Sequence, residues 1–335
     1  MASMRYTKKH ILSLVLLSFS LIAHTQDIHF SQFYAAPVSL NPAMTGLMNG
    51  NYRGTAIYRD QWRSVSTPYV TIGGAFDINL FKGTWKNDYI GLGLNFTDDF
   101  AGSSSFTSMQ MMFSLAYHKG LMDGHQLSLG FQAGMAQKSI NLAGLTFPNQ
   151  INGSGTAYDP GLPNNEMIGN KLSYMDFQAG FMYIGRMNDL LTIFQGGALH
   201  HITTPQETFL NGNNKLPMRI TAHGGAKVLM GNNLTLAPHY IFLMQSNAIE
   251  LNLGTALEFH LPDNASSDKF ASLGTYFRWR DAIVFVAGFG YLNYRMGISY
   301  DVNISSLNVA SNYMGGFEVS LAYEGPLEKM KKPGR

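Results

Sequence analysis

Apolar side chains recur at every second position through most of this chain from Asn51 onward. The clearest run places Ile90, Leu92, Leu94 and Phe96 between Gly91, Gly93 and Asn95. Neighbouring side chains of a β-strand point to opposite faces, so each such run has one apolar face and one small or polar face. Segments of about ten residues with this pattern are typical of strands in a membrane-spanning β-barrel. A soluble β-sandwich would carry more charge on its polar face.

The amino-acid composition supports a barrel wall in contact with lipid. Charged residues make up 13% of the 335 residues, about half the usual share of a soluble protein. Glycine (35), phenylalanine (22) and tyrosine (17) are abundant, and cysteine is absent, which excludes disulfides, thiolate metal sites and a lipoprotein anchor. The net charge of +2, with both signs scattered, provides no basic patch for nucleic acid.

The runs of alternation predict about 14 antiparallel strands. Five runs cover residues 52–59, 70–78, 90–96, 109–117 and 127–135, and nine more begin near residues 172, 190, 217, 233, 248, 270, 282, 292 and 312. An even number is usual for single-chain bacterial outer-membrane barrels. The fold class predicted is therefore all-β, a transmembrane antiparallel β-barrel over residues 51–325.

The lengths of the connections predict which end of the barrel faces outward. If the N-terminus is periplasmic, the long connections 139–170, 201–216 and 303–311 are odd-numbered and face outside. The tight turns at 119–123, 185–189 and 230–232 are then even-numbered and periplasmic, which is the expected asymmetry. The connection 261–269 is longer than this scheme predicts for a periplasmic turn.

Both ends of the chain lie outside the predicted barrel. Arg5, Lys8 and Lys9 precede an apolar run over residues 11–23, and small residues follow at the −3 and −1 positions of a cleavage site before Gln26. This pattern predicts a secretory signal peptide over residues 1–25, because the apolar run is too short to span a bilayer. Residues 326–335 form a predicted periplasmic tail.

Residues 26–50 are irregular, rich in Pro, Asn and aromatic residues, and directly precede the first alternating run. A backbone without regular hydrogen bonds cannot face lipid. We therefore expect this segment to be packed in or under the lumen as a plug. Arg53, Arg59, Asp60 and Arg63 are the candidates to hold it, because they are nearest in sequence.

Several titratable residues fall on the face that we assign to the lumen. They are Arg53, Arg59, Asp77, Arg219, His223, Lys227, Glu258, Arg278, Arg280, Arg295, Asp301 and Glu318. The favoured interpretation is that these charges pair across strands inside a polar lumen, with no substrate or cofactor involved. A transport or binding role is the alternative.

No arrangement of residues indicates an enzyme or a metal centre. His200 and His201 are adjacent, so on a strand they would point to opposite faces and could not share a metal as neighbouring ligands. Ser103, Ser104 and Ser105 lie in a predicted surface loop without a GxSxG elbow. The acidic pair Asp98–Asp99 and the loop 149–159 lack the residue order of an EF-hand and are interpreted as solvated loops.

Two stretches resemble a known family. HFSQFYAAPVSLNPAMTG at 29–46, with YRDQW at 58–62, is similar to the N-terminal hallmark of the PorP/SprF family of type IX secretion and gliding-motility membrane proteins of the Bacteroidetes. YRMGISYDVNISSL at 294–307 and GGFEVSLAY at 315–323 are similar to the family's closing strands. The matching N-terminal positions have no known catalytic role, and plug packing and first-strand closure are favoured for them: His29, Phe30, Phe33, Tyr34, Asn41, Pro42, Arg59, Asp60, Gln61 and Trp62.

The resemblance implies a non-enzymatic outer-membrane barrel that works with the type IX machinery. Members are needed for secretion or surface anchoring of cargo such as gliding adhesins, and some associate with periplasmic ring components. We expect the long outer connections to dock the C-terminal domain of the cargo, with Phe147, Tyr158, Ile168 and Phe209 as candidate anchors. The alternative function is an outer-membrane diffusion channel for small apolar molecules.

Overall fold

The computed structural model describes residues 27–325, except for 66, 86, 103–105, 143–144, 153, 156, 160, 164–168, 210–211, 262–268 and 307. The predicted signal peptide, residue 26 and the predicted tail 326–335 lie outside the described residues. Fourteen strands form one closed barrel. They are β1 (Tyr52–Gln61), β2 (Tyr69–Trp85), β3 (Asp88–Ala101), β4 (Phe106–Met122), β5 (His125–Ser139), β6 (Lys171–Arg186), β7 (Leu191–His200), β8 (Arg219–Leu229), β9 (Leu234–Gln245), β10 (Ala248–His260), β11 (Phe270–Arg278), β12 (Ala282–Tyr291), β13 (Tyr294–Asn303) and β14 (Met314–Gly325).

The barrel has the simplest possible order, in which each strand pairs antiparallel with its neighbours in sequence and β1 closes on β14. The closing pair runs from Tyr52 opposite Gly325 to Gln61 opposite Gly316. All fourteen predicted strands are present, and the nine later ones begin within two residues of the predicted positions. The predicted fold class is confirmed.

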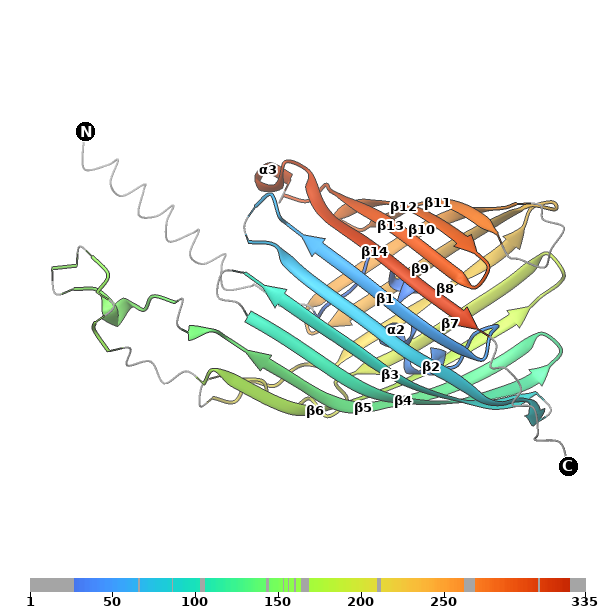
Figure 1. Cartoon of the computed structure of the whole chain (residues 1–335), viewed down its shortest axis with the longest axis horizontal. Helices are drawn as coiled ribbons and strands as arrows, with labels where there is room; N and C mark the ends of the chain where they lie inside the picture. Colours follow the sequence, from blue (N-terminus) through green and yellow to red (C-terminus); the bar gives the residue numbers. More distant parts are fainter. Residues whose placement is uncertain are drawn as a thin grey trace, which may run out of the picture.

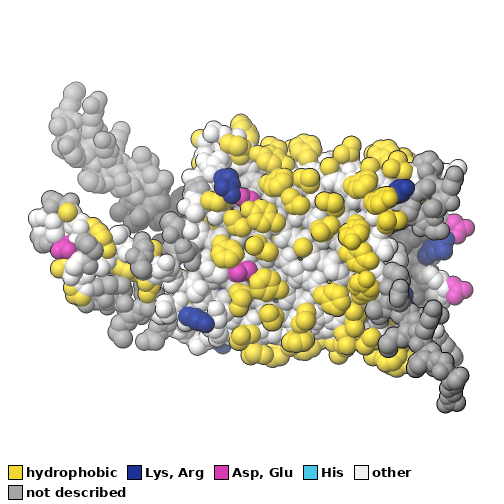
Figure 2. Space-filling model, in the orientation of Figure 1, with side chains coloured by type: hydrophobic (Ala, Val, Ile, Leu, Met, Phe, Trp, Pro, Cys, Tyr) yellow, Lys and Arg dark blue, Asp and Glu magenta, His cyan; other side chains and the backbone are white. Residues whose placement is uncertain are grey.

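The outer wall is apolar, as the alternation predicts. In β4, Met111, Phe113 and Leu115 are 51%, 68% and 51% exposed, whereas the intervening Met112 and Ser114 are buried. Figure 2 shows hydrophobic side chains spread over the barrel surface, with few charged ones among them. Such a surface is stable in contact with lipid, where apolar side chains need no burial by protein.

The connections differ between the two ends of the barrel. Connections 140–170, 201–218 and 304–313 lie at one end, where the first of them projects far beyond the rim (Figure 1, left). This end also carries two short helices, η5 (Pro148–Gln150) and α3 (Asn308–Ser311). The opposite end carries the tight turns after β4, β6 and β8, and also the longer connection 261–269. We call these the long-loop rim and the short-turn rim.

The N-terminal segment 27–51, called the plug below, lies inside the barrel. It contains three short helices, η2 (Phe33–Ala35), α2 (Pro37–Leu40) and η3 (Pro42–Met44). Pro37 and Pro42 each begin a helix, where the missing proline N–H costs nothing, and the Asn41 side chain caps η3 by accepting from the amide of Ala43 at 2.9 Å. Among the helices of the described residues, none is long and apolar enough to cross a membrane.

The plug runs through the lumen from the long-loop rim to the short-turn rim. Asp27 contacts Arg219 at the start of β8 and Gln245 at the end of β9, both at the long-loop rim. Asn51 reaches the start of β1 at the short-turn rim. The premise that the N-terminus lies on the short-turn side therefore holds for the first strand but is wrong for the first described residue.

Candidate functional site

The plug divides the lumen into two cavities. One of about 670 Å³ opens toward the long-loop rim and is lined by plug residues, by β2 to β9 and by residues of the connection 201–218 such as Leu216. The other, of about 400 Å³, opens toward the short-turn rim. Phe33 and Leu40 of the plug line both cavities, so the plug forms the floor of each.

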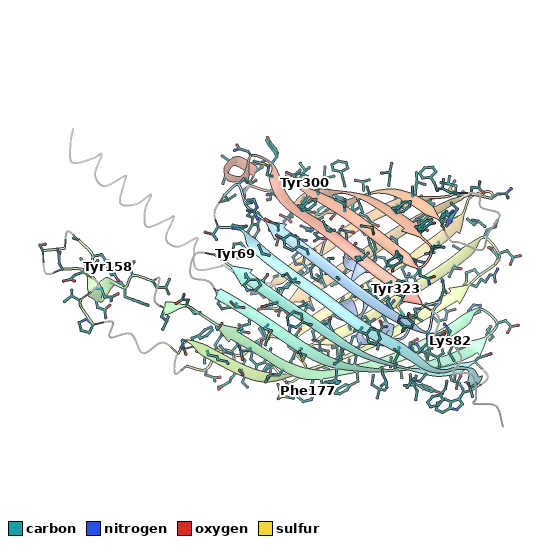
Figure 3. The ribbon with its side chains drawn as sticks, viewed as in Figure 1. Tyr69, Lys82, Tyr158, Phe177, Tyr300 and Tyr323 are labelled. Carbon is teal, nitrogen blue, oxygen red and sulfur yellow. The ribbon has the colours of Figure 1, made fainter. Side chains whose placement is uncertain are left out.

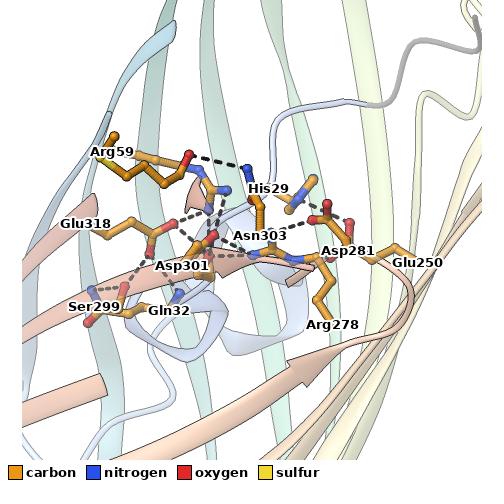
Figure 4. A network of polar contacts seen from close by, with 12 residues as sticks. His29, Gln32, Arg59, Glu250, Arg278, Asp281, Ser299, Asp301, Asn303 and Glu318 are labelled. Atoms are coloured by element: carbon orange, nitrogen blue, oxygen red, sulfur yellow. Dashed lines mark hydrogen bonds and ion pairs between the residues drawn. The ribbon is translucent and has the colours of Figure 1, made fainter. Parts of the chain in front are cut away.

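A buried polar network fixes the plug to β1, β13 and β14 (Figure 4). The carboxylate of Glu318 in β14 accepts the amide of Ser31 at 2.6 Å and the amide of Gln32 at 2.8 Å. Ser31 Oγ donates to Asp301 in β13 at 2.8 Å, and Arg59 in β1 pairs with both Glu318 and Asp301. Each of these five side chains is at most 1% exposed, so the network excludes bulk water.

Arg278 of β11 extends this network toward the long-loop rim. Its guanidinium group lies 3.1 Å from Asp301, 3.5 Å from Glu250 and 2.9 Å from Asp281. His29 Nε2 of the plug lies 3.1 Å from the other oxygen of Glu250. Burial lowers the pKa of His29 more than Glu250 raises it, so the ring is neutral near pH 7 and donates a hydrogen bond.

A second cluster holds the first residue of the plug. His201 Nε2 lies 2.5 Å from Asp27, and His201 Nδ1 lies 3.0 Å from Asp176 in β6. Burial alone would lower the pKa of His201, but hydrogen bonds to Asp176 and Asp27 raise it to about 9. Burial would likewise raise the pKa of Asp27, but Arg219 and His201 hold it well below its usual range. Both groups are therefore charged at neutral pH.

A third cluster holds the C-terminal half of the plug near the short-turn rim. Asp77 of β2 accepts the amide of Gly46 at 2.6 Å and pairs with Arg53 at 2.7 Å. Arg53 also donates to the carbonyl groups of Met44 at 3.0 Å and Leu47 at 3.2 Å. The Arg53–Asp77 ion pair of the wall thus binds one amide group and two carbonyl groups of the plug backbone.

Side chains of the plug itself complete its seat in the middle of the lumen. Phe33 and Tyr34 pack against His239 and Tyr276, and Tyr34 stacks on both rings with centroids 5.4 and 5.9 Å apart. Asn41, which is fully buried, donates to the carbonyl group of Phe181 at 2.9 Å. The plug therefore binds the wall through aromatic packing as well as through charge.

The structure places most family-motif residues in this seat, but not those at the end of β1. His29, Phe30, Phe33, Tyr34, Asn41, Pro42 and Arg59 lie in the plug or contact it. Asp60 instead pairs with the exposed Arg63. Gln61 ends β1, and Trp62 follows it with a φ of 55° and packs on Tyr69. Of the four residues expected to hold the plug, Arg53 and Arg59 do so, while Asp60 and Arg63 do not.

The charges assigned to the lumen face lie inside the barrel with one exception. Arg53, Arg59, Asp77, His223, Arg278, Asp301 and Glu318 are buried, and Arg219, Lys227, Glu258 and Arg295 line one of the two cavities. Arg280 is different, because β11 ends at Arg278 and Arg280 lies exposed in the following turn with a φ of 61°. Its assignment to the lumen is wrong.

Two further expectations are corrected by the structure. His200 and His201 do not point to opposite faces, because β7 ends at His200 and His201 has a φ of 56°, which turns both rings into the interior. Asp98 and Asp99 belong to β3 rather than to a loop, and Asp99 lines the larger cavity. Among the described residues no group of His, Asp or Glu has the arrangement of a metal site.

Four residues that matter most for the plug were missed by the sequence analysis. Asp27 and Ser31 lie in the plug itself, Glu250 contacts His29 of the plug, and Asp176 contacts His201, which holds Asp27. The alternation of β6 and β10 would have placed Asp176 and Glu250 on the inner face. No sequence pattern distinguishes Ser31 from other serines, because it acts through its backbone amide and through a hydroxyl group that every serine has.

The candidate docking residues lie in different surroundings. Tyr158 is 44% exposed in the projecting connection (Figure 3), where it forms an isolated bridge with Ile151, itself 47% exposed. Phe147 is half-buried near η5, and Phe209 is half-buried against Phe106 of β4. Ile168 lies outside the described residues.

A closed barrel with an apolar wall and a polar lumen filled by its own N-terminal segment defines a plugged transmembrane β-barrel. A family model described as "Type IX secretion system membrane protein PorP/SprF" matches residues 22–323. The chain therefore belongs to the PorP/SprF family, as its motifs suggested, and is a membrane protein of the type IX secretion system. The family is not one of enzymes.

Several solved barrels are similar in architecture. The "CymD monoaromatic hydrocarbon channel" aligns with a TM-score of 0.49 at 11% identity, over 88% of this chain and 93% of that one. The Pseudomonas putida toluene transporter TodX aligns with a TM-score of 0.49 at 9% identity, over 90% and 95%. The KdgM porin aligns with a TM-score of 0.37 at 8% identity, over 81% and 98%. A search of curated proteins finds no match.

Proposed function

We propose that this protein is exported by a cleaved signal peptide, inserts into the outer membrane and docks the C-terminal domain of a secreted cargo protein, such as a gliding adhesin, at the cell surface. Membership of the type IX family supports a role in secretion or surface anchoring. The observation that carries the docking role is the long-loop rim, where the projecting connection 140–170 stands beside a cavity of about 670 Å³.

The chemistry of the projecting connection suits protein docking. Ile151 and Tyr158 face each other on the isolated bridge and are both exposed, so they present a small apolar patch on the projecting connection. Binding energy in protein interfaces concentrates in a few large side chains of this kind. Phe209 and Phe147 serve to hold the loops, because both are already half-buried against their own chain.

The short-turn rim faces the periplasm in this proposal, where ring components of the secretion machinery could bind. The smaller cavity opens there and is lined by both cationic and anionic side chains, including Lys227 and Glu258. The lipid contact is made by the apolar wall between the two rims.

The docking role is tested by replacing Tyr158 and Ile151 with alanine and measuring the cargo retained on intact cells. We expect retention to fall about tenfold or more, as for loss of an interface hot spot. Tyr313→Ala is the matched control, because Tyr313 is a 59% exposed tyrosine at the same rim in a different connection. Unchanged retention with the double variant, at normal barrel levels in the outer membrane, would overturn the assignment of the docking patch.

A further inference from the structure

The seam between the first and last strands carries a buried ion pair at a defined place. Arg59 of β1 and Glu318 of β14 are direct partners in the seam register, and their side chains pair inside the lumen. The two residues are 1% and 0% exposed. This is where the barrel joins the two ends of its chain, so its pairing cannot be made locally during folding and must wait for both strands.

The wall alone does not satisfy the groups gathered at this seam. Two guanidinium groups, Arg59 and Arg278, face three buried carboxylates, Asp301, Glu318 and Glu250. The plug supplies further hydrogen-bond donors to these carboxylates. Amides of Ser31 and Gln32 occupy both oxygens of Glu318, and the ring of His29 reaches Glu250. Buried carboxylates that repel one another are stabilised by such donors.

Ser31 is the point where these groups meet. Its hydroxyl group donates to Asp301 and accepts from Arg59 at 2.8 Å and from Arg278 at 2.5 Å. It therefore links β1, β11 and β13, while its amide links β14. Among the described residues of the plug, only Ser31 forms hydrogen bonds to four strands.

The plug also touches the seam at the opposite rim. The amide of Asn51 donates to the carbonyl group of Gly325 at 2.9 Å, and its own carbonyl group accepts the amide of Asn79 at 2.9 Å. The segment thus continues β1 between β14 and β2 before it enters the lumen. Because it is continuous with β1, it reaches the seam whenever β1 does.

We propose that the Ser31–Gln32 turn is a clasp for barrel closure, so that β1 and β14 join stably only around the seated plug. Plugging and closure are then one event. The barrel has no empty closed state, and withdrawal of the plug weakens the seam as well as emptying the lumen. This inference does not depend on the cargo that the protein docks.

The absence of cysteine from the chain allows a direct test by engineered disulfides in the full-length protein folded in detergent. Thr55→Cys with Ala322→Cys reports on the seam, because the two positions are opposite each other in β1 and β14 and both line the smaller cavity. Ala136→Cys with Tyr174→Cys is the matched pair away from the seam, opposite each other in β5 and β6 and lining the larger cavity. Directly opposed strand residues are within disulfide reach.

Each cysteine pair is combined with Ser31→Ala, which leaves every wall charge in place, and separately with Glu318→Gln. We expect loss of the seam disulfide and normal yield of the β5–β6 disulfide. Asp60→Asn on the outside of β1 should change neither. A wild-type yield of the seam disulfide in Ser31→Ala and Glu318→Gln overturns the proposal. Loss of both disulfides in Ser31→Ala also overturns it, because the plug would then support the whole wall rather than the seam.

Discussion

At the residue scale, the lumen shows how ionised groups are tolerated when they are buried from bulk water. Asp77 is fully buried, pairs with Arg53 and accepts a hydrogen bond from the amide of Gly46. Arg53 also donates hydrogen bonds to two carbonyl groups of the plug. A buried pair satisfied in this way is stable, but removing one partner leaves the other without compensation. The same two residues paired at the surface would contribute little.

Asp77→Asn should therefore destabilise the barrel strongly, by about 3 kcal/mol, because Arg53 keeps its charge and loses its counter-ion. Thermal unfolding of the purified protein in detergent measures the effect. Asp60→Asn is the control, since its partner Arg63 is largely exposed and the loss should be at most about 0.5 kcal/mol. Equal melting temperatures for the two variants would contradict this reading of the Asp77 site.

At the scale of the element, the plug fits because glycines let its backbone approach the wall. A Cβ atom on Gly130 of β5 would lie 2.2 Å from the backbone of Pro42 and Ala43, and one on Gly91 of β3 would lie 2.0 Å from the carbonyl oxygen of Thr45. Glycines inside strands often mark such approaches.

Gly130→Ala should cost about 1–3 kcal/mol, as for other substitutions that overfill a packed site, because both sides of the contact are backbone. The measurement is the melting temperature of the variant in detergent, together with the rate of proteolysis within residues 27–50. Gly54→Ala in β1 is the control, since its Cβ would meet nothing within 4 Å. An unchanged melting temperature for Gly130→Ala would mean that the plug can shift at this contact without loss of stability.

The anchor at Asp27 should respond to pH. Since hydrogen bonds to Asp176 and Asp27 raise the pKa of His201 from 6.5 to about 9, its protonated ring contributes stability that is complete below pH 6.5. That contribution, at most on the order of 3 kcal/mol, is lost as the pH rises through 9. Melting temperatures across this window should fall for the wild type and stay level for His201→Gln. Parallel curves for both proteins would exclude His201 as the titrating group.

At the scale of the whole molecule, the fold was largely predictable and the site was not. A strand needs only its own two-residue period, so residues 90–96 and the inner positions of Arg53, Asp301 and Glu318 could be assigned locally. The seat of the plug depends on contacts between residues far apart in the chain, such as Ser31 with Glu318, which no local pattern encodes. The predicted orientations of Arg280 and His201 were wrong for a related reason. A left-handed φ after the end of a strand breaks the alternation of inward and outward side chains.

The plugged lumen leads us to expect no conduction. Purified protein in planar bilayers should be electrically silent, and liposomes that contain it should not swell with small solutes, because the plug separates the two cavities. A diffusion channel for small apolar molecules would instead speed their uptake when purified alone. Stable openings of the wild-type protein, or such uptake, would favour the channel over the docking role.

The path of the plug has a consequence for labelling. Asp27 is held at the long-loop rim, while Gly325 ends the last strand at the short-turn rim. These two residues therefore face opposite sides of the membrane. A fluorophore or epitope joined before Asp27 would report on the side of the long-loop rim. A label joined after Gly325 would report on the side of the short-turn rim. A single molecule can thus carry its own orientation marker.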